Sequence, residues 1–169
     1  IAYKQVNATL ETELTEQSML ARIGQIIGSE LELDSVFAEV STELSTLIDF
    51  DVVFVTTLNK EKTRLRNIFC AGKSAEHFTN RQWSGVTDKN VAQILNSTHP
   101  HRVDLVVIDS KKAPSQFKLA RELGLKSALM IPLISEGIPF AILNLRSSKR
   151  HAYDNVSDDF LQRIGEQIA

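Results

Sequence analysis

The chain has 169 residues, of which 43% are hydrophobic and 24% are charged, and its formal net charge is −2. This length and composition predict one globular domain with a core of ordinary size. The near-neutral charge excludes a strongly basic nucleic-acid-binding surface, and no apolar stretch approaches the roughly 20 residues of a membrane-spanning helix. The single cysteine, Cys70, excludes an internal disulfide and a multi-cysteine zinc site.

The first residue is isoleucine, and the last helical pattern continues to the final residue. We therefore expect a fragment of a longer protein, from which any targeting segment has been removed. A cytoplasmic location is the expectation, since nothing in the sequence requires an oxidising compartment.

The N-terminal segment, residues 2–31, has the periodicity of a helix. Val6, Leu10 and Leu14 recur at a spacing of four, and the positions between them are mostly polar. A stripe this narrow is too thin to bury fully against a globular core, so it favours pairing with another helix. A frayed terminal helix is the alternative.

A second helix is predicted for residues 33–48, with Asp34 as its N-cap. Its apolar residues fall together on one side: Val36, Phe37, Val40, Leu44 and Leu47.

The pattern then changes to β-branched and aromatic residues over 49–59, which predicts a strand. Residues 60–63 form a charged turn, and 64–72 predict the returning strand of a hairpin.

The middle of the chain is less regular. Residues 81–97 predict a loop and a short helix that is capped by Thr87 or Asp88. The inner face of that helix is formed by Val91, Ile94 and Leu95. Residues 98–110 predict a loop with a short extended piece, and 113–125 predict a second short helix that ends at Gly124.

Two strongly apolar runs, residues 126–134 and 138–146, predict neighbouring strands that are covered on both faces. Ser135-Glu136-Gly137 forms the turn between them, with Gly137 at positive φ. Pro132 and Pro139 cannot donate a ladder hydrogen bond, so each predicts a bulge or an edge position.

The last segment, residues 154–169, predicts a helix capped by Ser157, with Phe160, Ile164 and Ile168 at a spacing of four. Hairpins set among helices predict an α+β fold with an antiparallel sheet rather than a doubly wound one. Long helices at both ends can connect a ligand site to an output module.

Three phrases resemble the GAF domain, a small sensory module of bacterial signalling proteins and cyclic-nucleotide phosphodiesterases. They are "SELELDSVFAEVSTELSTLIDFDVVFVTTLN", "LGLKSALMIPLISEGIPFAILNLRSS" and "AYDNVSDDFLQRIGEQIA", and they occur in the family's order and spacing. The resemblance covers residues 20–169. It implies a GAF domain there and a separate signalling or coiled-coil helix over residues 1–19.

The resemblance implies a PAS-related antiparallel sheet of about six strands, with helices on one face and a loop-enclosed pocket on the other. It also implies a homodimer through the terminal helices, for which the candidates are Val6, Leu10, Leu14, Phe160, Ile164 and Ile168. The similarity is greatest to modules that precede sensor histidine kinases or sigma-54-dependent activators. That implies a role in two-component signalling or transcription regulation, with any kinase, ATPase or cyclase domain outside this segment.

Residues that carry chemistry in subfamilies are mostly missing. Cys70 has no neighbouring histidine, which argues against a covalent bilin, and a single cysteine argues against methionine sulfoxide reduction. Asn144 is followed by Leu145 and Arg146 instead of the lysine of cyclic-nucleotide-binding members. A metal or haem site built on His99, His101 and Asp104 is a remote alternative, since no known ligand spacing is present.

No hydrolase, phosphate-loop or metalloprotease motif is present, so no catalytic residue is assigned. We predict a non-enzymatic sensory domain with an unidentified small-molecule ligand between the sheet and residues 78–123. The candidate pocket residues are Phe54, Thr56, Cys70, Trp83, Val91, Met130 and Asn144. The alternative is a dimerisation or spacer module without a ligand. A cyclic-nucleotide or metal-based sensor is a remote alternative, and the cofactor is unknown.

Overall fold

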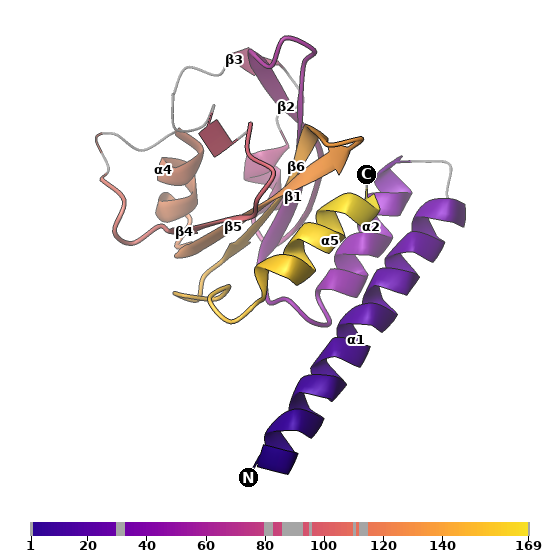
Figure 1. The fold of residues 1–169 in the computed structure, drawn as a ribbon. Helices are drawn as coiled ribbons and strands as arrows, with labels where there is room; N and C mark the ends of the chain where they lie inside the picture. Colours follow the sequence, from indigo (N-terminus) through magenta and orange to yellow (C-terminus); the bar gives the residue numbers. More distant parts are fainter. Residues whose placement is uncertain are drawn as a thin grey trace.

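The computed structural model of the chain describes residues 2–29, 33–79, 83–85, 93–94, 96–109, 111 and 115–168. In this part of the chain, a six-stranded sheet has the order β3-β2-β1-β6-β5-β4, and every pair of neighbours is antiparallel. Three long helices cover one face of the sheet, and shorter elements lie over the other (Figure 1). The predicted α+β fold with an antiparallel sheet is therefore confirmed.

The helices and strands occupy most of the predicted segments. The strands are β1 Val52–Leu58, β2 Arg64–Gly72, β3 Ser84–Gly85, β4 His101–Asp104, β5 Ser127–Ser135 and β6 Ile138–Ser147. The long helices are α1 Ala2–Ser29, α2 Leu33–Leu44 and α5 Asp158–Ile168. On the other face lie the 3-10 helix η1 Ala75–Phe78 and the helix α4 Ser115–Glu122.

The central hairpin joins β5 to β6 through a tight turn at Glu136 and Gly137, whose φ angles are 51° and 79°. Positive φ at both positions is the geometry of a type I′ turn, which suits the twist of the strands.

The ladder register shifts between Leu133 and Ile134, and Ile134 pairs with Pro139. β4 pairs with β5 only as far as Met130, so Pro132 has no strand on its outer side. The predicted glycine and proline positions are confirmed.

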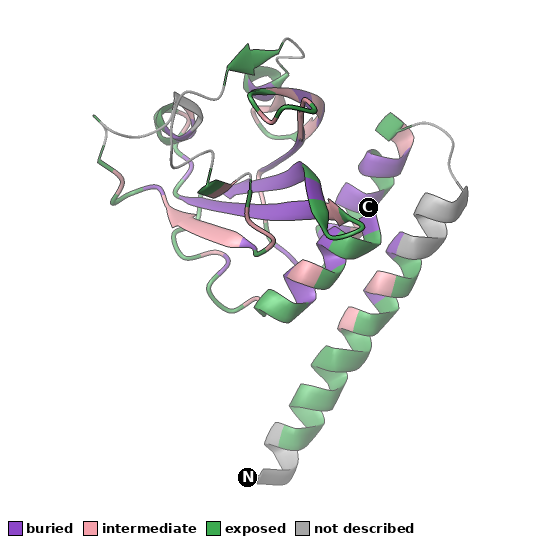
Figure 2. Ribbon diagram, turned by 45° about the horizontal axis from the view of Figure 1, so that its top comes forward, coloured by how far each residue is buried: buried purple, intermediate pink, exposed green. Residues whose placement is uncertain are grey.

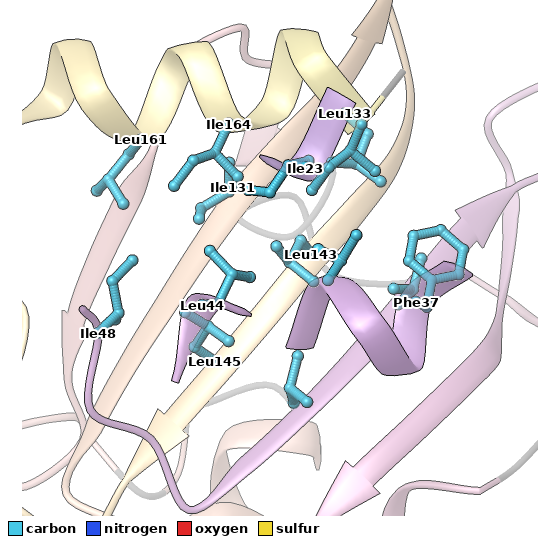
Figure 3. Packing of buried hydrophobic residues seen from close by; sticks show 14 of the residues in the cluster. Ile23, Phe37, Leu44, Ile48, Ile131, Leu133, Leu143, Leu145, Leu161 and Ile164 are labelled. Atoms are coloured by element: carbon cyan, nitrogen blue, oxygen red, sulfur yellow. The ribbon is translucent and has the colours of Figure 1, made fainter. Parts of the chain in front are cut away.

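The main core lies between the sheet and the three long helices. Ile23 of α1, Leu44 of α2 and Ile164 of α5 are fully buried against strand residues such as Leu143 (Figure 3). α5 lies so close to β5 that a Cβ added at Gly165 would approach the Pro132 carbonyl oxygen to 2.2 Å. The glycine therefore sets the distance between this helix and the sheet.

Helix α2 differs from its prediction at both ends. Asp34, predicted as the cap, lies in the first turn of the helix. The helix ends at Leu44 rather than at residue 48, because the backbone bonding changes to a tighter pattern, in which Thr46 N donates to Glu43 O and Leu47 N donates to Leu44 O. As a result Ile48 is buried, whereas Leu47, which was predicted to face the core, is 39% exposed.

Helix α1 is continuous, and its two halves have different environments. Met19 and Ile23 are buried against the core, whereas the N-terminal half extends past the body of the domain and is exposed (Figure 2). None of the described helices is long and apolar enough to cross a membrane. Of the loop and short helix predicted for residues 81–97, residues 93–94 are described as helical, and the predicted caps Thr87 and Asp88 lie outside the described residues.

The start of α5 agrees with its prediction. The Ser157 hydroxyl oxygen accepts a hydrogen bond from Phe160 N at 3.2 Å. Asp158 and Asp159 follow in the first turn, where the helix dipole favours negative charge.

Candidate functional site

The strand register places four predicted site residues in one row across the sheet. His101 pairs with Met130, Met130 pairs with Asn144, Asn144 pairs with Phe54, and Phe54 pairs with Cys70. Directly paired residues point to the same face of a sheet. This is the face opposite the three long helices, because Phe54 and Met130 belong to the second apolar cluster.

The second apolar cluster covers this face. The ring of Phe54 stacks on that of Phe78 from η1, with centroids 4.7 Å apart and planes 15° apart. Phe117 and Ala120 of α4 and Leu105 complete the cover and are buried. The described part of this face is therefore packed with apolar side chains.

A chain of hydrogen bonds crosses the face from β6 to η1. Asn144 Nδ2 donates to Thr56 Oγ1 at 3.1 Å, and Thr56 Oγ1 donates to Asn67 Oδ1 at 2.8 Å. Asn67 Nδ2 then donates to the Phe78 carbonyl oxygen at 2.7 Å. These side chains are buried, so the bonds hold three strands and η1 in one arrangement. Asn67 was not among the predicted site residues.

Arg146 is a buried cation on this face, and its side chain has no exposed surface. Its guanidinium carbon lies 5.1 Å from the Phe54 ring centre and 5.6 Å from that of Phe117. Nη1 donates to Leu145 O at 3.1 Å and Nη2 to Asn144 Oδ1 at 3.5 Å, whereas Nε has no hydrogen-bond partner among the described residues. Burial lowers the pKa of Arg146 to about 10, which still leaves it charged at neutral pH.

The sequence prediction did not assign a role to Arg146. The residue ends the second apolar run, a position that ordinarily belongs to the exposed end of a strand. One signal does point to it: Arg146 is two residues from Asn144, so both share a face of the strand.

Cys70, at the end of the row, is a hydrogen-bond donor. Its Sγ donates to the Ala75 carbonyl oxygen at 3.2 Å. Burial, together with the negative charge of Glu76, raises the pKa of the thiol to about 11. The thiol is therefore protonated at neutral pH and weakly nucleophilic.

The remaining pocket candidates are not brought into the row. Trp83 is 41% exposed at the β3 edge of the sheet, and the guanidinium carbon of Arg66 lies 4.5 Å from its ring centre. Val91 lies outside the described residues. Both remain predictions as ligand contacts.

The residues of the remote metal alternative are not arranged as a ligand set in the described part of the chain. His101 lies in the row with its Nε2 buried and without a partner among the described residues, and burial and the charge of His99 lower its pKa. Asp104 instead forms an ion pair with Arg150 at 3.0 Å. Within the described ranges, no group of three or more His, Cys, Asp or Glu side chains is arranged to hold a metal ion.

The helix candidates for dimer contacts divide into two groups. On α1, Val6, Leu10 and Leu14 are 57%, 50% and 63% exposed. On α5, the candidates Phe160, Ile164 and Ile168 are buried in the main core of the same chain. The exposed apolar stripe available to a second chain is therefore that of α1.

A groove of about 500 Å³ lies beside α1. Its α1 wall includes Ala8, Thr12 and Thr15, and its other wall includes Leu47 and Val156. Successive residues of an α-helix are turned by about 100°, so Leu10 lies about 200° from both Ala8 and Thr12. The apolar stripe of α1 thus points away from the groove and from the domain.

Comparisons with known proteins agree with this architecture. A sequence model described as a GAF domain matches residues 30–169. The phycoerythrobilin-bound GAF domain of a cyanobacterial phytochrome has a TM-score of 0.69 and 17% identity, over 92% of this chain and 93% of that one. The GAF domain of a phosphoenolpyruvate-protein phosphotransferase from Coxiella burnetii has a TM-score of 0.70 and 13% identity, over 92% and 90%. That of a two-component sensor histidine kinase from Bacillus halodurans has a TM-score of 0.65 and 18% identity, over 82% and 90%.

No curated protein matches the chain. At these identities the solved structures show a common fold, and the match of the sequence model over most of the chain establishes the family. The resemblance found in the three sequence phrases is confirmed: the chain belongs to the GAF domain family.

Proposed function

We propose that this GAF domain is a non-catalytic sensory module that binds a small molecule on the face of the sheet opposite the long helices. One observation carries the proposal. Along β1 and β6 the buried polar side chains Thr56, Asn144 and Arg146 share this face, whereas their neighbours Val55 and Leu143 pack under the helices. Burying a cation there costs free energy unless it gains a partner, and a ligand would supply that partner.

The family supports the same role. GAF domains of a sensor histidine kinase and of cyanobacterial phytochromes share the fold, and two of the phytochrome domains hold a bilin. A methionine sulfoxide reductase with the same fold also exists. Cys70 does not suit that chemistry, because it is the only cysteine and its thiol has a raised pKa.

Strands β1 and β6 connect the face that carries Thr56, Asn144 and Arg146 to the helices on the other side of the sheet. Asn144 and Arg146 alternate with Leu143 and Leu145, which belong to the main core with α2 and α5. A ligand that shifts β6 therefore also shifts the surface on which the helices pack, since close-packed cores transmit small displacements. We propose that the signal leaves through the terminal helices of a homodimer, with α1 as the contact between the two chains.

A specific observation favours a second function, that of a dimerisation or spacer module without a ligand. The rings of Phe54, Phe78 and Phe117 fill the described part of the face, as a collapsed pocket requires. Both functions use the exposed stripe of α1. They differ only in whether the face of the sheet opposite the long helices accepts a ligand.

Native mass spectrometry of gently purified protein, followed by a thermal-shift screen of metabolites, separates the two functions. A sensory module should retain a small molecule or be stabilised by one, and replacing Asn144 with Leu should weaken that stabilisation. Thr57→Val on the neighbouring position of β1 is the matched control, because Thr57 is not among the polar residues of this face. If no compound is retained and none raises the melting temperature, the module without a ligand is correct.

A further inference from the structure

We propose that the ligand of this domain is a small molecule with an oxyanion group, a carboxylate or a phosphate, that pairs with the guanidinium of Arg146. This inference rests on the proposed sensory function and names the chemical class of its ligand. Arg146 is fully buried, and only two of its five N–H donors have hydrogen bonds to described residues, at 3.1 and 3.5 Å.

Arg146 has no negatively charged partner among the described residues. A guanidinium has five N–H donors and remains charged in proteins, and a buried charge is costly unless it is paired. Near Arg146, the described residues offer one backbone carbonyl oxygen and one amide oxygen, and no carboxylate. The arginines that form ion pairs elsewhere in the described chain all do so with a carboxylate: Arg22, Arg102, Arg150 and Arg163.

The N–H donors of Arg146 that have no partner also have a defined geometry. The rings of Phe54 and Phe117 form cation–π contacts with the guanidinium, but these contacts use none of its N–H groups. Among the described residues Nε has no acceptor, and the acceptor of Nη2, Asn144 Oδ1, is 3.5 Å away. Nε and its neighbouring Nη form the fork that binds the two oxygens of a carboxylate or phosphate.

A ligand cannot reach Arg146 in the structure as it stands. Because Arg146 has no exposed surface, a ligand reaches it only when its cover moves. Phe117 of α4 is the covering side chain that comes from outside the sheet, and α4 is a helix of 8 residues. We therefore place the oxyanion between the sheet and α4, beside Phe54, in a position that Phe117 covers in this structure.

The test measures melting temperature with acetate, succinate and inorganic phosphate, against sodium chloride at the same ionic strength and against acetamide and succinamide. Wild-type protein should be stabilised by at least one oxyanion and by neither amide. In Arg146→Met the dissociation constant for that oxyanion should rise about tenfold or more, because hydrogen bonds to a charged partner are lost. Arg66→Met, which removes a guanidinium that lies on Trp83, is the matched control and should bind like wild type.

Carboxylate and phosphate are distinguished by which of the probes stabilises the protein. Should Arg146→Met fail to fold, Arg146→Lys retains the charge but not the fork, and it should also bind the oxyanion more weakly. The inference is overturned if no oxyanion exceeds the effect of sodium chloride, or if the Arg146 variants bind as well as wild type. Neutral metabolites that stabilise wild type and Arg146→Met equally would leave the sensory function standing and remove only the oxyanion.

An internal partner for Arg146 is the remaining explanation, and a further variant tests it. Residues 86–92 contain one carboxylate, Asp88, and lie outside the described residues. If Asp88→Asn and Arg146→Met lower the melting temperature equally and the double variant is no worse than either, the two residues form an ion pair and the inference is wrong. We expect Asp88→Asn to retain oxyanion binding.

Discussion

Cys70 lies at the end of the row of paired residues that runs from His101 through Asn144 and Phe54, and its Sγ donates a hydrogen bond to Ala75 O at 3.2 Å. Since its pKa is raised to about 11, it has roughly 100-fold less thiolate at pH 8 than an ordinary thiol with a pKa near 9. We expect its reaction with DTNB to be slower than that of the same chain unfolded in guanidinium chloride by at least this factor. Equal rates in the folded and unfolded chain would contradict the buried hydrogen bond.

His101 should make stability depend on pH. Burial, and then the charge of His99, lowers its pKa in the folded state below the ordinary value of 6.5. The unfolded chain therefore binds more protons, so the contribution is fully present above pH 6.5 and is lost as the pH falls through the folded pKa. Urea unfolding should show decreasing stability as the pH falls from 7 to about 5.

Two variants assign this pH dependence. His101→Gln should flatten the profile, because it removes the titrating group from the buried position. His77→Gln removes an exposed histidine and serves as the control. A profile that His101→Gln leaves unchanged would assign the dependence to other groups.

Thr56 stands at the centre of the hydrogen-bond chain, where it accepts from Asn144 and donates to Asn67. Thr56→Val preserves the shape but leaves Asn67 Oδ1 without its donor, and we expect a loss of about 1–3 kcal/mol in the free energy of unfolding. Thr57→Val, at the next position, should change it much less. Urea denaturation of both variants measures the difference, and equal losses would show that the chain of bonds adds little.

Single residues of the site could be predicted only in part. Phe54, Met130 and Asn144 follow from their places in the strands, since residues two apart share a face. The register that brings Phe54 beside Asn144 depends on the pairing of β1 with β6, which no local pattern specifies. Arg146 is buried because β1 and β5 flank it and Phe117 covers it, and these are long-range contacts.

At the scale of elements, the close contact of α5 with β5 depends on Gly165. Alanine there would gain about 1 kcal/mol in helix propensity. Its Cβ would also meet the backbone oxygen of Pro132 at 2.2 Å, and a backbone atom cannot move away cheaply. We expect Gly165→Ala to destabilise the domain by about 1–3 kcal/mol in urea unfolding, because overpacking outweighs the propensity.

Glu166→Ala, on the exposed side of the same turn of α5, is the control for this substitution. It should change the free energy of unfolding by no more than about 0.5 kcal/mol. A neutral or stabilising Gly165→Ala would mean that α5 lies farther from the sheet.

Elements with a strong local pattern agree with their predictions, and the exceptions have a physical cause. β5 and β6 follow from two apolar runs around a turn whose residues favour positive φ. The end of α2 does not follow from apolar spacing. There, Ser45 Oγ donates to Thr42 O and Thr46 Oγ1 donates to Glu43 O, and such bonds compete with the continuing helix.

At the scale of the whole molecule, the placement of α1 decides how a second chain can be reached. Met19 and Ile23 attach its C-terminal half to the core, so the exposed N-terminal half has a fixed direction (Figure 2). The sequence predicts a separate helix over residues 1–19, and this boundary remains a proposal. The continuous helix means that a change in the core reaches the N-terminal half without crossing a loop.

The apolar stripe of α1 predicts a homodimer. Leu10 and Leu14 are at least half exposed and point away from the domain, and covering them against the same stripe of a second chain would remove apolar surface from water. The double variant Leu10→Ser/Leu14→Ser should therefore sediment as a monomer in sedimentation velocity. Its melting temperature should fall by no more than the loss of the dimer accounts for. Leu47→Ser, which removes a partly exposed leucine from the groove on the opposite side of α1, should leave the dimer intact. A wild-type chain that stays monomeric across a wide range of concentrations would remove the pairing of α1 from the proposed mechanism, and the ligand face would then have to act within one chain.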